Sequence, residues 1–166
     1  TSIPTGHEGY RAIIYKFKSS IPTPVINISV SSLSAFTATY PNLSSSQLFS
    51  VSGPFLGNSL TVTSSIPYEI SANGSTYSNS LIFVPLLGSI PLSKVFVRLK
   101  AGSNAGVTNS FINCVSNGTP SKSVSLSATI AKSNLTVTAA NVSRAYNTSN
   151  PVFQYVASGL INGDNV

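Results

Sequence analysis

Hydrophobic and polar residues alternate with a period of two in several short stretches of this chain. In the region 59–100, Leu60 and Val62 alternate with threonines, and residues 95–99 repeat the pattern. Successive side chains of a β-strand point to opposite faces, so this period predicts strands. Turn signals such as Asn73-Gly74 separate the stretches, and Asn-Gly supplies the positive φ angles of a tight turn. The pattern therefore predicts an all-β fold.

Short apolar or alternating stretches predict strands along the whole body of the chain. They lie at 25–31, 47–52, 60–62, 68–70, 81–84, 95–99, 111–115 and 124–130. The run 81–84 is continuously apolar, which is typical of a central strand that is covered on both sides. Asn73-Gly74 separates it from the stretch 68–70. We therefore expect a hairpin over 68–84 whose loop lies within 71–77.

The spacing of these strands also predicts how the chain divides. Seven or eight strands with turns every 8–12 residues favour an immunoglobulin-like two-sheet sandwich over residues 25–131. Residues 1–24 contain a tail, an isolated strand at Tyr10–Lys18 and a linker with two prolines. Alternation restarts at Leu135 and Val137, so residues 132–166 are expected to form part of a second β domain.

That last segment is too short to bury a core of its own. From Asn134 to Val166 it has about 33 residues, and units below ~40 residues rarely fold without a disulfide, a metal or a partner. The stretch Tyr10–Lys18 likewise has no neighbouring strand to pair with. We therefore expect the chain to be part of a longer polypeptide, or to complete its structure with a neighbour.

Composition supports a folded, weakly charged protein. There are 32 serines, 14 threonines and 15 asparagines, whereas only 7% of residues are charged and 42% are hydrophobic. This apolar content argues against disorder. The net charge of +6 comes from scattered cations, and their one local cluster, Arg11, Lys16 and Lys18, belongs to no recognisable nucleic-acid-binding fold, so nucleic-acid binding is not expected. No apolar run approaches the ~20 residues of a membrane span.

Two parts of the chain resemble known families. The first is an Ig-like repeat of very large bacterial surface proteins that use type IX secretion, found in Gram-negative, often gliding, bacteria. It is carried by residues 34–53, 60–107 and 121–130, and most specifically by Tyr68-Glu69-Ile70-Ser71 and Val97-Arg98-Leu99-Lys100-Ala101.

The second resemblance covers the C-terminal part, which is similar to the opening half of an MBG domain of adhesins. Its marks are Ala145-Tyr146, Asn150-Pro151-Val152-Phe153 and residues 158–164. The glycine that usually follows the tyrosine is Asn147 here, and asparagine also tolerates a left-handed backbone. Together the resemblances imply an extracellular, repetitive, non-enzymatic protein of the cell surface, with a role in adhesion or fibre building. They imply no active-site residues.

Candidate catalytic groups are few and far apart in the sequence. His7 is the single histidine, and the three acids Glu8, Glu69 and Asp164 lie in separate segments. Catalytic and metal sites need several convergent groups. We therefore expect no enzymatic activity, no catalytic or metal residues and no cofactor. Glu69 should point outward from a strand and bond a nearby arginine or lysine.

Three further features have both a structural and a functional interpretation. Cys114 follows Ile112 with a period of two and is expected to be buried, reduced and inert. Seven Asn-x-Ser/Thr triplets are formal glycosylation acceptors, and we expect most to be unmodified; they begin at Asn27, Asn42, Asn73, Asn117, Asn134, Asn141 and Asn147. Tyr10–Lys18 mixes aromatic residues with cations. It is either the last strand of a preceding domain or a strand that pairs with another chain or a ligand.

These observations favour a structural or adhesive repeat region of a secreted cell-surface protein. Its expected partners are other repeats of the same chain or identical neighbouring chains, and surface glycans. The first alternative is a filament subunit that assembles by strand pairing between chains. The second is a carbohydrate-binding module, for which the absence of tryptophan is unfavourable because such modules use exposed aromatic platforms.

Overall fold

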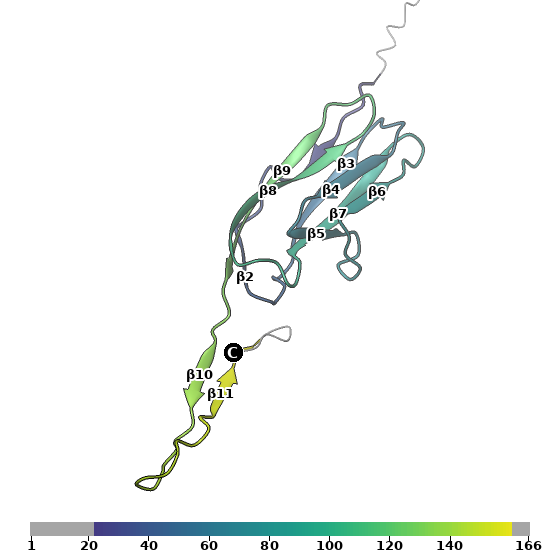
Figure 1. Ribbon diagram of the computed structural model, residues 1–166. Coiled ribbons are helices and arrows are strands. Elements are labelled where there is room, and N and C mark those ends of the chain that lie inside the picture. The colour runs from purple at the N-terminus through teal and green to yellow at the C-terminus, as the bar shows by residue number, and fades with distance from the viewer. Residues whose placement is uncertain (1–21, 161–166) are drawn as a thin grey trace, which may run out of the picture.

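A computed structural model of the chain describes residues 22–160, and this part contains strands and no helix. Two sheets pack face to face as a sandwich, and a separate two-stranded ribbon follows the last strand of the sandwich (Figure 1). The predicted all-β fold is therefore confirmed. Because no helix is present among these residues, none is long and apolar enough to cross a membrane.

The first sheet has four strands in the order β1-β3-β7-β5, and all neighbours are antiparallel. The strands are β1 (Asn27–Ile28), β3 (Gln47–Gly53), β5 (Tyr68–Ser71) and β7 (Ile90–Leu99). A register shift between Val51 and Gly53 marks a bulge where β3 meets the beginning of β7.

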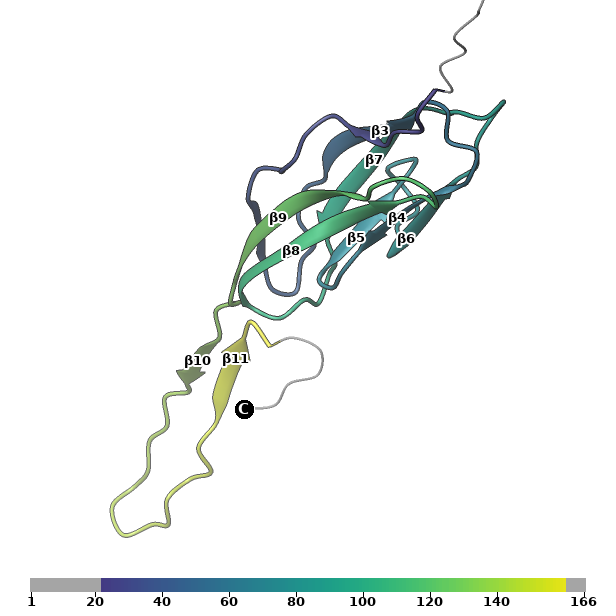
Figure 2. The same ribbon diagram turned by 90° about the horizontal axis from the view of Figure 1, so that it is seen from above.

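The second sheet has five strands in the order β2-β9-β8-β4-β6. They are β2 (Phe36–Thr39), β4 (Leu60–Ser64), β6 (Ser80–Phe83), β8 (Gly106–Val115) and β9 (Lys122–Ala131). The pair β2–β9 is parallel and the others are antiparallel. Figure 2 shows β8 and β9 lying over the strands of the other sheet.

The strand order corresponds to that of an immunoglobulin sandwich. The strands β1, β3, β7 and β5 take the positions A, B, E and D, and β4, β8 and β9 take the positions C, F and G. The strand β5 precedes β6 in sequence, so the chain enters the first sheet before it returns to the edge of the second.

The core lies between the two sheets and follows the alternation seen in the sequence. Phe49 and Val51 of β3 and Val95 and Val97 of β7 are at most 1% exposed. In the second sheet, every strand except β6 contributes buried residues to the core, and β6 contributes only partly buried residues. The buried residues of this sheet are Phe36, Leu60, Val62, Ile112, Cys114, Val124, Leu126, Ala128 and Ile130. Burial of this much apolar surface is the main force that holds the sheets together.

The ribbon consists of β10 (Thr136–Ala139) and β11 (Tyr155–Ser158), paired antiparallel. Every residue of β10 is exposed, as are three of the four in β11. The ribbon extends away from the end of β9 in both views (Figures 1 and 2). An isolated two-stranded unit of this kind is only marginally stable in water.

The expected hairpin over 68–84 is wrong in part. Its loop lies where predicted, because Ile70 and Ser78 exchange two backbone hydrogen bonds of 2.7 and 2.8 Å around residues 71–77. However, β5 pairs with β7 and β6 pairs with β4, so the two strands belong to opposite sheets. The local Asn-Gly signal predicts the turn correctly, but each of the two strands pairs with a different strand that the local signal does not indicate.

The loop itself is held by side chains. Ser71 Oγ accepts hydrogen bonds from the backbone N–H groups of Asn73 and Gly74, and Asn73 Oδ1 accepts them from Ser75 and Thr76. Gly74 has a φ of +74°, the left-handed conformation that glycine adopts at low cost.

Three further strand predictions need correction. The apolar run 81–84 is not central: β6 is an edge strand, and Ile82 and Val84 are 67% and 72% exposed. The strand expected over 25–31 has only two residues, Asn27–Ile28, and Val30 is 39% exposed. The strand β2 was not predicted, because its sequence FTAT carries a single large apolar residue, Phe36.

Candidate functional site

The candidate catalytic residues are not brought together. His7, Glu8 and Asp164 lie outside the described residues, as does the stretch Tyr10–Lys18. Within residues 22–160 there is no group of three or more His, Cys, Asp or Glu side chains that could hold a metal ion. Glu69 is the one acid in this part of the chain, and its surroundings can be described directly.

Glu69 forms an ion pair with a neighbouring strand, as the sequence predicted. Its Oε1 accepts a hydrogen bond of 2.7 Å from Nε of Arg98, the residue opposite it on β7. The guanidinium of Arg98 also lies 3.6 Å above the centre of the Tyr77 ring, at cation–π distance. The ion pair and the cation–π contact together join β5, β7 and the loop 71–77. This cluster therefore has a structural role.

Cys114 is buried, as its phase with Ile112 predicted. Both side chains are 0% exposed, and the thiol is free. Burial raises the pKa of the Cys114 thiol to about 11, because an apolar surrounding disfavours the thiolate. A nucleophilic cysteine needs the opposite shift.

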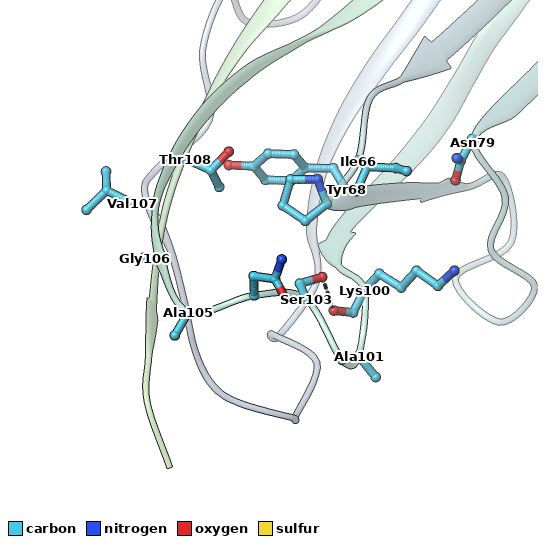
Figure 3. Close-up of a pocket in the computed structure, with 13 residues that line it drawn as sticks. Ile66, Tyr68, Asn79, Lys100, Ala101, Ser103, Ala105, Gly106, Val107 and Thr108 are labelled. Atoms are coloured by element: carbon cyan, nitrogen blue, oxygen red, sulfur yellow. Dashed lines mark hydrogen bonds between the residues drawn. The ribbon is translucent and has the colours of Figure 1, made fainter. Parts of the chain in front are cut away.

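One open cavity lies at the end of the sandwich from which β9 continues toward the ribbon. This end pocket of about 590 Å³ is bounded by the β4–β5 turn, including Pro67, and by the loop that joins β7 to β8. Figure 3 shows Ile66 and Tyr68 on one side and Lys100 and Ser103 on the other. The loop is fixed because Lys100 N donates to the carbonyl of Pro67, and Ser103 Oγ donates to the carbonyl of Lys100.

Tyr68 is the most unusual polar group of the end pocket. The residue is 1% exposed, and its ring packs edge-on against Phe36 with the ring centres 5.5 Å apart. Its hydroxyl is buried and has no hydrogen-bond partner in the described part of the chain. Burial raises the pKa of Tyr68 to about 12. An unpaired buried hydroxyl costs free energy, so this position is optimised for packing and not for ionisation.

The end pocket could not be located from the sequence. Its walls come from segments about 35 residues apart, residues 66–68 and 100–108. Pro67, Gly102 and Gly106 signal turns there, but they do not show that the turns face each other. The pocket offers hydroxyl and amide groups and one cation, without an acid or a nucleophile pair.

The other notable surfaces are open ones. The outer face of the five-stranded sheet carries Val107, Phe111 and Val115 of β8, all of which are exposed. The asparagines of the seven Asn-x-Ser/Thr triplets are all exposed. Asn147 has a φ of +61°, which is the left-handed conformation that asparagine tolerates.

Comparison with known proteins identifies one part of the chain. Residues 135–166 match the family model of the MBG domain (YGX type). The match begins just before β10 and includes β11. No curated protein matches the chain. The C-terminal resemblance is thereby confirmed, and it is consistent with an adhesin-like region of a surface protein.

Proposed function

We propose that this chain is a structural and adhesive repeat region of a secreted cell-surface protein, and that it has no enzymatic activity. The observation that carries the proposal is the tandem arrangement of two different β units. The sandwich ends with β9 at Ala131, and the MBG match begins at residue 135, so only three residues separate them. Short connections between β modules are typical of extended surface proteins, and the Ig-like resemblance with its type IX export agrees with this role.

The sandwich has the properties that a rigid spacer needs. Its core is continuous between the two sheets, and the ion pair of Glu69 with Arg98 joins β5 to β7 within the first sheet. The sandwich stands without a disulfide, because the one cysteine is a free thiol. Repeated units of this kind would hold weak binding surfaces away from the cell, where many simultaneous contacts add up to strong attachment.

The location is tested by antibody labelling of intact cells of the organism that makes the protein. Antibodies are raised against residues 22–160 and applied before and after permeabilisation. We expect equal labelling in both cases, and loss of the signal when intact cells are treated with a protease. Labelling that requires permeabilisation would contradict the proposal.

A second candidate function, the filament subunit, is favoured by the open edge of the five-stranded sheet. The edge strand β6 and the residues that follow it expose Ile82, Val84, Leu86 and Leu87, at 67% to 99%. An exposed apolar edge can pair with a strand of another copy. In this case Ile82→Lys should abolish assembly, and electron microscopy of the unmodified protein should show a regular repeat. Unassembled particles at high concentration would exclude this candidate.

A further inference from the structure

The outer face of the five-stranded sheet differs from the rest of the sandwich in its charge. Among the five strands the one charged residue is Lys122, which alternates in phase with the buried Val124 and Leu126 and lies at the beginning of β9. On the four-stranded sheet, by contrast, Glu69, Lys94 and Arg98 occupy positions of β5 and β7 that are not buried. The outer positions of the five-stranded sheet are therefore all uncharged.

These outer positions combine apolar side chains with free hydroxyl and amide groups. Along β8 the exposed residues alternate as Val107, Asn109, Phe111, Asn113 and Val115. The strand register places Ser125 opposite Phe111, Ser123 opposite Asn113 and Thr63 on the other side of Asn113. The side chains of Asn109, Asn113 and these serines make no hydrogen bond within the described residues, so they are available to a ligand.

A shallow groove surrounds Phe111 on this face. The Phe111 groove has a volume of about 260 Å³ and is lined by Ser32, Leu33, Asn109, Phe111, Ser125 and Ser127. Its wall is fixed, because the backbone of Leu33 donates a 3.1 Å hydrogen bond to the carbonyl of Ser125 and Ser125 N donates a 2.9 Å bond to Ser31. It is smaller than the ~300–1,000 Å³ of pockets that enclose a whole small molecule. It therefore suits one ring of a longer ligand that continues across the sheet.

We propose that the face around the Phe111 groove binds a neutral polysaccharide. A sugar ring has C–H bonds on its faces and hydroxyl groups around its edge, so it complements an aromatic ring flanked by amides and hydroxyls. The C–H groups meet the electron-rich face of Phe111, which is 53% exposed. Asn109 and Asn113 each offer a donor and an acceptor on either side of that ring. The absence of charge favours a neutral ligand over an acidic one.

The proposal specifies the partner of the adhesive role and so rests on the proposed function, but the two can fail separately. Binding is measured on the purified 166-residue chain, whereas location is measured on intact cells. Single sites of this kind are weak, so the chain is biotinylated and clustered on streptavidin. Retention is then measured on immobilised neutral glucan, mannan and galactan, and on polygalacturonate as the acidic comparison.

We expect clustered protein to be retained on at least one neutral polysaccharide, and retention to persist at an ionic strength of about 0.5 M, because no charge takes part. Phe111→Ala should lower the retention about fivefold or more, and Asn109→Ala should also lower it. The matched control is Leu48→Ala, which removes a similarly exposed apolar side chain (46%) from the other sheet and should change nothing. Unchanged melting temperatures establish that all variants are folded.

Several results would overturn the proposal. One is that the clustered protein is not retained on any neutral polysaccharide. Another is that Phe111→Ala leaves the retention unchanged. The third is that the protein is retained on polygalacturonate alone and is released by salt. Sedimentation provides a further check: a dimer that Phe111→Ala dissociates would assign the face to contacts between copies of this chain.

Discussion

Buried polar groups determine how individual residues of this chain respond to substitution. Tyr68 and Cys114 lie in the core: the Tyr68 hydroxyl has no hydrogen-bond partner among residues 22–160, the Cys114 thiol is free, and burial raises the pKa of both groups. Each contributes packing, and neither gains from its polar atom. The consequences differ, because Tyr68→Phe keeps the ring that fills the core, whereas removal of the Cys114 sulfur takes away most of that side chain.

Tyr68→Phe should leave the stability unchanged or raise it by about 1 kcal/mol. The substitution removes a buried hydroxyl that has no partner and keeps the ring that packs against Phe36. Denaturant unfolding measures the difference. A loss of more than about 1 kcal/mol would show that the hydroxyl has a stabilising partner, such as a water molecule in the end pocket.

Cys114→Ser should destabilise the sandwich by about 1–3 kcal/mol, since it places a more polar group among apolar side chains. In the unmodified protein, a thiol reagent at pH 8 should label Cys114 only as fast as the protein opens. The same reagent supplies the control, because labelling should become rapid in denaturant. Fast labelling of the native protein would contradict the buried position.

The pKa values also predict a loss of stability in alkali. Both groups have a higher pKa in the folded state than their ordinary values of 9.0 and 10.0, namely about 11 for Cys114 and about 12 for Tyr68. The unfolded state therefore loses these protons first, and the free energy of unfolding should be constant below pH 9 and fall as the pH rises toward 12. In Cys114→Ala the decline should begin about one pH unit higher. A stability that is independent of pH from 8 to 12 would disprove the assignment.

At the scale of elements, the turn between β5 and β6 depends on backbone conformation. A Cβ atom at Gly74 would meet the ring of Phe96 at 3.6 Å, which is ordinary contact, so space does not limit this position. The φ of +74° at Gly74 does limit substitution, because residues with a Cβ rarely adopt this angle. Gly74→Val should therefore cost more than ~1 kcal/mol.

Gly57→Val is the matched control for Gly74→Val. A Cβ at Gly57 has no atom within 4 Å, and its φ is not in the left-handed region. Both variants are compared by denaturant unfolding, and Gly57→Val should be nearly neutral. Equal losses in the two variants would show that the left-handed conformation is not the cause.

The sequence predicted elements well where alternation and burial coincide, and poorly where pairing depends on distant segments. The stretches around Phe49, Val62, Val97 and Val124 became core strands, because each alternates over several residues. The run at Leu81–Val84 was predicted to be central, but it lies at an edge, since hydrophobicity alone does not tell which neighbours a strand has. The end pocket and the uncharged face arise from strand order, which no local pattern encodes.

At the scale of the whole molecule, residues 22–160 form one well-packed unit and one open unit. The sandwich has a core, whereas the ribbon buries none of its residues. Hydrogen exchange should therefore show fast exchange of the β10 and β11 amides and strong protection of β3, β7 and β8. Protection of the ribbon equal to that of the sandwich would mean that the ribbon is covered by another chain or by further strands.

The attachment of cells tests the proposed adhesive role of the whole molecule most directly. Cells of the natural producer are compared with cells whose protein lacks residues 22–160 through an in-frame deletion, at equal amounts of surface protein as measured by labelling a remaining segment. Attachment is measured as the fraction of cells that stay on a surface under flow. We predict that the deletion lowers this fraction. Unchanged attachment at equal surface levels would contradict the adhesive role.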